Sequence, residues 1–269
     1  MYEELYESIP DPDAYLRRLR MPRPGALNRE YLNRLVYAHQ RYVVFENLDP
    51  FVYHRPVSLG IRDLYEKLIV RGRGGFCFEL NALLTQLLRD LGYQAYGCMA
   101  RILRNKDFIP PVLHRGILIR LPEQLYFCDV GYGGPMPPGA IAVEEGAELK
   151  ARGESYWMER ADEIWWTVRR LTSAGLEEKV IQFYTVPQRE VNFLPLSGYC
   201  AHSPDSVFTQ KLFLNRRTEG GSVNILGDVF TRVEQGAETK SRIRGREELL
   251  HIIKTEFDID LSGEEIPGI

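Results

Sequence analysis

Residues 71–81 read Arg-Gly-Arg-Gly-Gly-Phe-Cys-Phe-Glu-Leu-Asn, and the most regular apolar pattern of the chain begins at their end. Six leucines recur there at helical spacing: Leu80, Leu83, Leu84, Leu87, Leu88 and Leu91. This period predicts a helix with one apolar face, and Gly92 stands where a C-terminal cap belongs. Cys77 therefore occupies the first turn of a helix, directly after a Gly-Gly pair.

This position suits a nucleophile. A thiol at a helix N-terminus faces unpaired N–H groups, and nearby cations help to lower a cysteine pKa from ~8.5 to between about 3.5 and 7.5. Gly75 would let the backbone approach a substrate closely and would supply an amide donor for an oxyanion. A lone cysteine at this place is equally compatible with a buried structural role.

A nucleophilic cysteine needs a base, and His114 is the best-placed of the five histidines. Residues 113–121 and 125–132 read as two strands joined by a turn at Pro122. His114 and Asp129 share a face of this hairpin, within ~8 Å, if paired residue numbers sum to an odd value near 243 or 245. An even sum would place them on opposite faces, and each residue alone has an ordinary explanation, as a strand-end histidine and a turn aspartate.

In the rest of the chain the predicted secondary structure changes from helices to strands near residue 93. Helical patterns cover much of 11–92, including a helix from Asn28 to Gln40, and His39 is expected on the polar side of that helix. Strand patterns of period two follow at 94–104, 164–171 and 179–185. Beyond residue 186 the types mix, with helical signal at 204–214, strands at 222–234 and a helix at 245–257.

The amino-acid composition argues against several classes of function. The 269 residues carry 34 basic and 37 acidic side chains and a net charge of -3, so no nucleic-acid partner is expected. The apolar runs are too short for a membrane span, and the acidic N-terminus does not read as a signal peptide, so we expect a cytoplasmic protein with free thiols and no membrane partner. No histidine pair has metal-ligand spacing, and we predict no metal.

The motifs together resemble those of the arylamine N-acetyltransferase family. They occur in the expected order as Phe45-Glu46-Asn47-Leu48, the run from Arg73 to Asn81, His114, Asp129-Val-Gly-Tyr-Gly-Gly134 and, more weakly, Ser203-Pro-Asp-Ser-Val-Phe208. They span about residues 45–208, and the run around Cys77 is long and specific.

The resemblance implies an α+β fold with a papain-like core. Its parts would be a helical domain carrying the cysteine (1–92), a central β-barrel carrying the histidine and aspartate (93–190) and an α/β lid (191–269). It also implies the enzyme class, an acyltransferase active on small-molecule aromatic amines in xenobiotic metabolism. Acetyl-CoA would be a co-substrate, with no tightly bound cofactor, and the oligomeric state stays open.

The resemblance further implies a catalytic triad of Cys77, His114 and Asp129. A ping-pong reaction would carry an acetyl group on Cys77 as a thioester and pass it to an arylamine, arylhydrazine or N-hydroxyarylamine. The remaining implied site residues are Phe45, Tyr132 and Phe208 for the aromatic substrate, Gly75, Gly131, Gly133 and Gly134 for the oxyanion or cofactor, and Glu46 with Arg73 as structural support.

The sequence departs from the family pattern near the expected site entrance. Tyr132 replaces a common phenylalanine, and Ser197 and His202 stand where asparagine and threonine are usual. These departures keep open an amide synthase that releases a carrier-bound polyketide or other acyl thioester on the same fold. A thiol hydrolase is a lesser alternative, because it shares the Cys–His–Asp order. Lys211, Arg216 and Arg217 are candidates for the coenzyme A phosphates, although each also suits a solvated surface.

Overall fold

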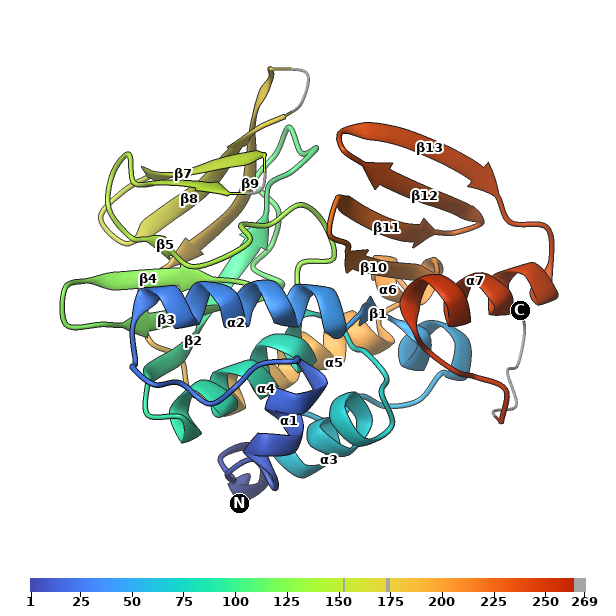
Figure 1. The fold of residues 1–269 in the computed structure, drawn as a ribbon, viewed down its shortest axis with the longest axis horizontal. Coiled ribbons are helices and arrows are strands. Elements are labelled where there is room, and N and C mark those ends of the chain that lie inside the picture. The colour runs from blue at the N-terminus through green and yellow to red at the C-terminus, as the bar shows by residue number, and fades with distance from the viewer. Residues whose placement is uncertain (152, 173–174, 264–269) are drawn as a thin grey trace.

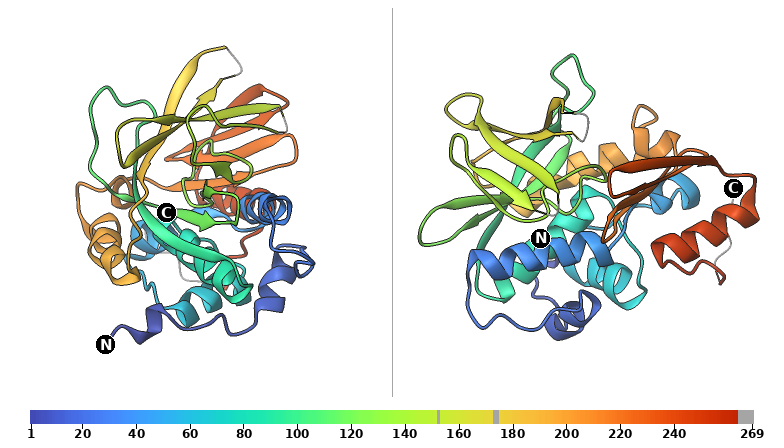
Figure 2. Two further views of the ribbon diagram at one scale, coloured as in Figure 1. Left: turned by 90° about the vertical axis from the view of Figure 1, so that its left-hand side faces the viewer. Right: turned by 45° about the horizontal axis from the view of Figure 1, so that its top comes forward.

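The protein has an α+β fold in which a layer of helices carries two sheets that lie side by side (Figures 1 and 2). The structure is a computed structural model that describes residues 1–151, 153–172 and 175–263. This architecture agrees with the fold class expected from the sequence.

The N-terminal helices begin at residues whose side chains cap them. Asp11 accepts a hydrogen bond from the amide of Ala14 (2.9 Å), and Asn28 accepts one from the amide of Tyr31 (2.9 Å). The helices of this layer are α1 (Pro12–Arg18), α2 (Arg29–Tyr42), α3 (Ile61–Tyr65), a π-helical turn (Glu66–Val70) and α4 (Cys77–Asp90), with single turns at Glu3–Leu5 and Asp49–Tyr53.

Helix α4 is the centre of this layer, and its position confirms the helix predicted from the leucine pattern. Every residue from Cys77 to Leu88 is buried. Gly92 follows with φ of 101°, a conformation that favours glycine at a helix end.

The larger sheet is a nearly closed antiparallel barrel. Its eight strands, counted within the described residues, run in the order β5 (Ile141–Ala142), β4 (Leu125–Cys128), β3 (His114–Arg120), β2 (Gln94–Ile102), β9 (Glu177–Tyr184), β8 (Trp165–Leu171), β7 (Glu154–Arg160) and β6 (Glu148–Ala151). The two edges approach each other because β5 lies against β6 and β7.

Three of these barrel strands, β5, β6 and β7, are absent from the sequence prediction. Strand β6 reads Glu-Leu-Lys-Ala, residues that do not favour strands, and it forms by pairing with β7. On β7 only Tyr156 and Met158 are buried, and the half-buried Trp157 between them hides the alternation of apolar and polar residues.

The smaller sheet joins one short strand from the N-terminal part of the chain to four strands from its C-terminal part. Its order is β1 (Phe45–Glu46), β10 (Phe213–Arg217), β11 (Gly221–Leu226), β12 (Val229–Glu234) and β13 (Ala237–Arg242), and α7 (Arg246–Phe257) packs against it. The motif at 45–48 therefore begins with a short strand that pairs with β10.

The helical signal at 204–214 is largely wrong. That region contains only α6 (Val207–Gln210) before β10 begins at Phe213, whereas the longer helix, α5 (Leu194–His202), precedes it. Sheet pairing of Leu214 with Glu46 and Ile225 outweighs the local helical pattern.

His39 lies in the core and not on the polar side of α2. It is 0% exposed, and its Nε2 is 2.8 Å from the hydroxyl of Tyr15. Burial lowers the pKa of His39 to about 3, with a smaller contribution from Arg18. No helix in the described ranges combines the length and apolar surface that a bilayer span requires.

Candidate active site

Cys77 is the first residue of α4, and the residue before it, Phe76, is hydrogen-bonded to the helix. Glu79 accepts a hydrogen bond from the amide of Phe76 (3.0 Å), which fixes the start of the helix. The loop after β4 lies directly over this turn: a Cβ at Gly131 would be 2.7 Å from the Cα of Cys77. Glycine at 131 is therefore required for this close approach.

Burial raises the pKa of the Cys77 thiol well above its ordinary value, and Cys200 and Asp129 raise it further. The backbone amides of Arg115 and Phe78 act in the opposite direction. The sequence suggested that arginines would lower this pKa. That expectation is wrong for Arg73, because its guanidinium is bonded to Glu46 and Asp49.

His114 opens β3 and Asp129 follows the last residue of β4. Ile117 pairs with Cys128, which is one of the odd-sum registers that the sequence left open. His114 Nε2 lies 2.5 Å from Asp129 Oδ2, and the two side chains are 3% and 0% exposed. Strand β4 ends earlier than the expected Tyr132, since the Asp129 side chain turns the backbone by accepting the amide of Gly131 (2.7 Å).

Asn81 joins the helix to both strands, a role that sequence reasoning missed. Its Nδ2 donates to Asp129 Oδ1 (2.9 Å) and to the carbonyl of Arg115 (2.5 Å), and its Oδ1 accepts the amide of Val130 (3.0 Å). The spacing held a signal, because a residue four positions after Cys77 lies on the same face of the helix.

Gln40 supports the same loop from α2. Its Nε2 donates to the carbonyls of Asp129 (2.9 Å) and Pro137 (2.8 Å). Gln40 is 3% exposed. No local pattern indicated this role of Gln40, since the loop that it holds is about 90 residues away in the chain.

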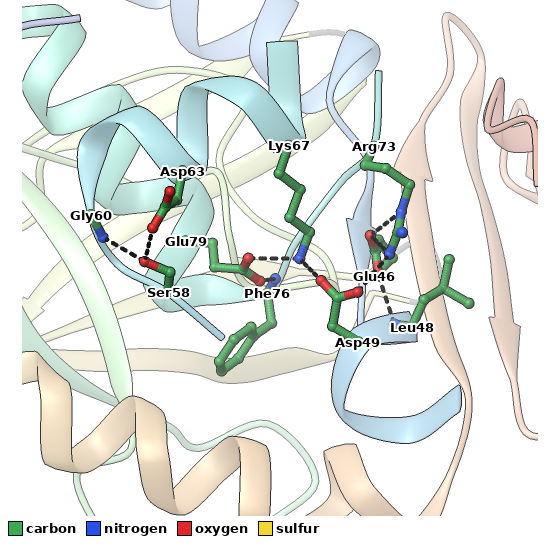
Figure 3. Close-up of polar contacts among 10 residues, drawn as sticks. All are labelled: Glu46, Leu48, Asp49, Ser58, Gly60, Asp63, Lys67, Arg73, Phe76 and Glu79. Atoms are coloured by element: carbon green, nitrogen blue, oxygen red, sulfur yellow. Dashed lines mark hydrogen bonds and ion pairs between the residues drawn. The ribbon is translucent and has the colours of Figure 1, made fainter. Parts of the chain in front are cut away.

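A buried charged cluster lies beside the start of α4 (Figure 3). Arg73 donates to Glu46 through Nε (3.0 Å) and Nη2 (2.8 Å), and Nη2 also reaches Asp49 (3.3 Å). Lys67 contacts Asp49 and donates to Glu79 (2.7 Å). The expected Glu46–Arg73 pair is thus one part of a group of three carboxylates and two cations.

Burial and the neighbouring charges shift the pKa values of two carboxyl groups in this cluster, Glu79 and Asp49. Burial raises the pKa of Glu79 to about 7, and the negative charges of Asp49 and Glu46 add to this against the attraction of Lys67. For Asp49 burial is opposed by Lys67 and Arg73, which together lower its pKa. Glu79 therefore holds a proton more readily than Asp49 does.

The three aromatic residues expected at the substrate lie around the same centre. Phe45 and Phe208 have ring centroids 6.0 Å apart, and Phe208 also packs against Phe76 at 5.6 Å. The ring of Tyr132 stands edge-on to His114 at 6.3 Å. Phe213 extends the group at 4.9 Å from Phe45, a contact that the sequence did not indicate.

The four glycines expected at the oxyanion or the cofactor differ in what they contact. The amide of Gly75 donates to the carbonyl of Val44 (3.2 Å) and that of Gly131 to Asp129, so in this structure neither is free to bind an oxyanion, contrary to the expectation for both. Gly133 has φ of 73° and touches the ring of Phe45, and Gly134 lies against the ring of Tyr132.

The three basic residues expected at the coenzyme A phosphates differ in exposure and in partners. Arg217 is already engaged by Glu154 and by the carbonyl of Met136 (2.6 Å), whereas Lys211 is exposed and Arg216 is half-buried. Ser197 is buried and His202 is exposed. Within the described ranges, no group of three His, Cys, Asp or Glu side chains is placed to hold a metal ion.

Comparisons with known proteins agree with this geometry. The N-acetyltransferase family model matches residues 28–266. An arylamine N-acetyltransferase / N-hydroxyarylamine O-acetyltransferase of Salmonella typhimurium is 30% identical over 83% of this chain and 79% of its own length.

Two solved structures share the fold. The arylamine N-acetyltransferase of Mycobacterium smegmatis superposes with a TM-score of 0.87 at 30% identity, covering 94% of each chain. The arylamine N-acetyltransferase of Mycobacterium marinum, solved in complex with CoA, has the same TM-score and coverage. Its identity to this chain is 24%, which supports a shared fold only. These relatives favour acyl transfer to arylamines over an amide synthase or a thiol hydrolase. The chain therefore belongs to the arylamine N-acetyltransferase family and is an acyltransferase.

Proposed function

We propose that Cys77 is the nucleophile of a ping-pong acetyl transfer, with His114 as its base and Asp129 as the partner of that base. The observation that carries the proposal is the buried His114–Asp129 hydrogen bond beside the first turn of α4. A Cys–His–carboxylate arrangement of this kind activates a thiol without a metal.

Because burial raises the pKa of Cys77, its sulfur needs a base that takes the proton as it attacks. Because Nε2 of His114 is bonded to Asp129, Nδ1 is the nitrogen that would take this proton as the sulfur attacks. The carboxylate of Asp129 then stabilises the imidazolium, and the Asn81 and Gly131 donors keep that carboxylate in place.

In the first half-reaction the Cys77 sulfur would bond to the acetyl carbonyl carbon of acetyl-CoA, and the bond from that carbon to the coenzyme A sulfur would break. The coenzyme leaves as a thiol with the proton that His114 holds. In the second half-reaction the amine attacks the Cys77 thioester, gives a proton to His114, and leaves as the amide while Cys77 recovers its proton.

The oxyanion of each tetrahedral intermediate needs donors close to Cys77. We infer that the amides of Cys77 and Phe78 supply them, since amides in the first turn of a helix have no partner within it and the Phe78 amide already faces the Cys77 sulfur. Gly133 and Gly134 remain proposed contacts for the coenzyme.

The acceptor would lie between Phe45, Tyr132 and Phe208, whose flat apolar faces suit an aromatic amine, hydrazine or N-hydroxyarylamine. Acetyl-CoA as donor is supported by family membership and by the CoA complex of the Mycobacterium marinum protein. A role in cytoplasmic xenobiotic metabolism follows from the same acceptor class and is part of this proposal.

We also propose the division into a helical domain (1–92), a barrel (93–190) and a lid (191–269). Cys200 of α5 lies close enough to Cys77 to raise its pKa, which supports a lid that covers the nucleophile. Covering the thioester would limit its hydrolysis.

The test is to mix the protein with acetyl-CoA without an acceptor and to map any acetyl adduct by mass spectrometry. The adduct is expected on Cys77 and should be discharged by 4-aminosalicylate or hydralazine, while Cys98, Cys128 and Cys200 serve as internal controls. An adduct that survives Cys77→Ser would overturn the assignment. No adduct on a Cys77 that iodoacetamide still alkylates would point to a different donor.

A further inference from the structure

A cavity of about 370 Å³ opens beside α2, apart from the acyl-transfer centre. Its lining comes from the end of α1, from α2 and from two barrel loops: Leu19, Arg20, Met21, Asn33, Arg34, Tyr37, Ala38, Arg41, Tyr42, Pro138 and Leu149. None of these belongs to the triad or to the aromatic group around it. Figure 1 shows α2 between α1 and the barrel, where these segments meet.

The cavity is strongly positive. Three arginines line it and no carboxylate does. Arg20 and Arg34 form no ion pair with any residue that the structure describes, and Arg41 reaches only Glu219, at 3.9 Å, whose side chain is 84% exposed. An exposed pair at this distance neutralises little charge, so the guanidinium groups keep their capacity for an anion.

Aromatic rings hold the arginines in place. The guanidinium of Arg20 lies 4.7 Å from the ring centre of Tyr42, and that of Arg41 lies 5.5 Å from Tyr42 and 5.7 Å from Tyr37. Stacking of this kind orders the planar groups before a ligand arrives. Leu19, Ala38 and Leu149 add an apolar wall.

We propose that this cavity binds an organic anion, a sulfonate, carboxylate or phosphate carried on a flat apolar body. The volume lies in the range of small-molecule sites, the arginines supply the charge, and the rings and aliphatic side chains receive the body. The shared chemistry has two possible sources, a free aromatic anion or the phosphates of coenzyme A.

The site is independent of the proposed nucleophile, so it can be tested with the acyl centre blocked. Naphthalene-1-sulfonate is titrated calorimetrically into full-length protein whose Cys77 has been alkylated with iodoacetamide, and 1-naphthol serves as the neutral probe. One equivalent of the sulfonate should bind, and 1-naphthol should bind at least tenfold more weakly.

Two variants locate the site. Arg34→Gln with Arg41→Gln should weaken sulfonate binding about tenfold. The matched control is Arg62→Gln with Arg71→Gln, which removes two arginines that are 78% and 68% exposed elsewhere, and it should bind as the parent does. Ala38→Leu, which fills the cavity and keeps every charge, should also lose binding, and circular dichroism checks that each variant is folded.

Competition separates the two sources. If coenzyme A displaces the sulfonate from the parent and the Arg34/Arg41 variant binds coenzyme A more weakly, the anion is a coenzyme phosphate; without displacement, it is a free aromatic anion. No saturable binding, unchanged affinity in the Arg34/Arg41 or Ala38 variant, or loss of binding on alkylation of Cys77 would overturn the proposal.

Discussion

His114 Nε2 lies 2.5 Å from Asp129 Oδ2, although 15 residues separate the two in the chain. The β3–β4 hairpin brings them together, and Asn81 of α4 fixes the carboxylate from the other side. Because the imidazole and the carboxylate are both buried, water does not compete for this bond. The orientation of the imidazole is therefore set by the fold, and each contact can be tested alone.

His114→Ala removes the proposed base. We expect turnover of acetyl-CoA and arylamine to be abolished, because the buried Cys77 thiol then has no group that accepts its proton. The measurement is the steady-state rate, with circular dichroism to show that the variant is folded. A folded variant that keeps full activity would show that another group is the base.

Asp129→Asn keeps the size of the side chain but changes the partner of His114. An amide that donates to Nε2 would place the imidazole proton on Nδ1, so the nitrogen proposed to receive the Cys77 proton would be occupied. We expect the rate of Cys77 acetylation to fall on the order of 10⁴-fold, as found for such a substitution in another triad. Acetylation at the parent rate, followed by mass spectrometry, would contradict this role.

Asn81→Ala should lower the stability of the fold. It leaves the carbonyl of Arg115 and the amide of Val130 buried without their partner, at a cost of about 1–3 kcal/mol. The melting temperature should fall by about 2–12 °C, given roughly 2–4 °C per kcal/mol for a chain of this size. The control, Asn192→Ala, removes one exposed hydrogen bond to Gln188 and should melt within about 1 °C of the parent. Equal melting temperatures for the two variants would show that Asn81 is not structurally required.

Much of this site could be predicted from local patterns. The leucine period placed α4 and hence Cys77 at its first turn, and the strand patterns placed the hairpin of His114 and Asp129. The register needed the structure, because a shift of one residue leaves the sequence equally plausible while it moves Asp129 to the other face.

The contacts that the sequence did not predict join segments far apart in the chain. Lys67 and Glu79 meet across 12 residues, and Gln40 reaches a loop 89 residues away. Strand β1 has two residues and forms only because β10 lies beside it. No local period indicates such partners, since they depend on how complete elements pack.

Gly131→Ala tests the close approach of the loop to α4. The added methyl would lie 2.7 Å from the Cα of Cys77 and 2.9 Å from Nδ2 of Asn81, so the helix start or the loop must move. We expect a loss of about 1–3 kcal/mol in the free energy of unfolding and more than tenfold slower acetylation. The matched control is Gly198→Ala in α5, where nothing lies within 4 Å and alanine should stabilise by about 0.5–1 kcal/mol. Parent-like acetylation in Gly131→Ala would show that the loop tolerates a side chain.

Glu79 should make stability depend on pH. Its pKa is raised in the folded protein from 4.5 to about 7, so its contribution to stability is complete below pH 4.5 and is lost as the pH rises towards and through 7. The main cause is burial, to which the negative charges of Asp49 and Glu46 add against the attraction of Lys67. Glu79→Gln stays neutral at every pH and lacks this dependence.

The advantage of the parent over Glu79→Gln, measured as the free energy of urea unfolding, should therefore fall by about 2–3 kcal/mol between pH 5 and 8. Glu66→Gln, which removes an exposed carboxylate from the pair with Arg71, controls for the loss of one negative charge. If the parent and Glu79→Gln changed in parallel over this range, Glu79 would not be the group that takes up the proton, and the ion pair with Lys67 would then outweigh burial.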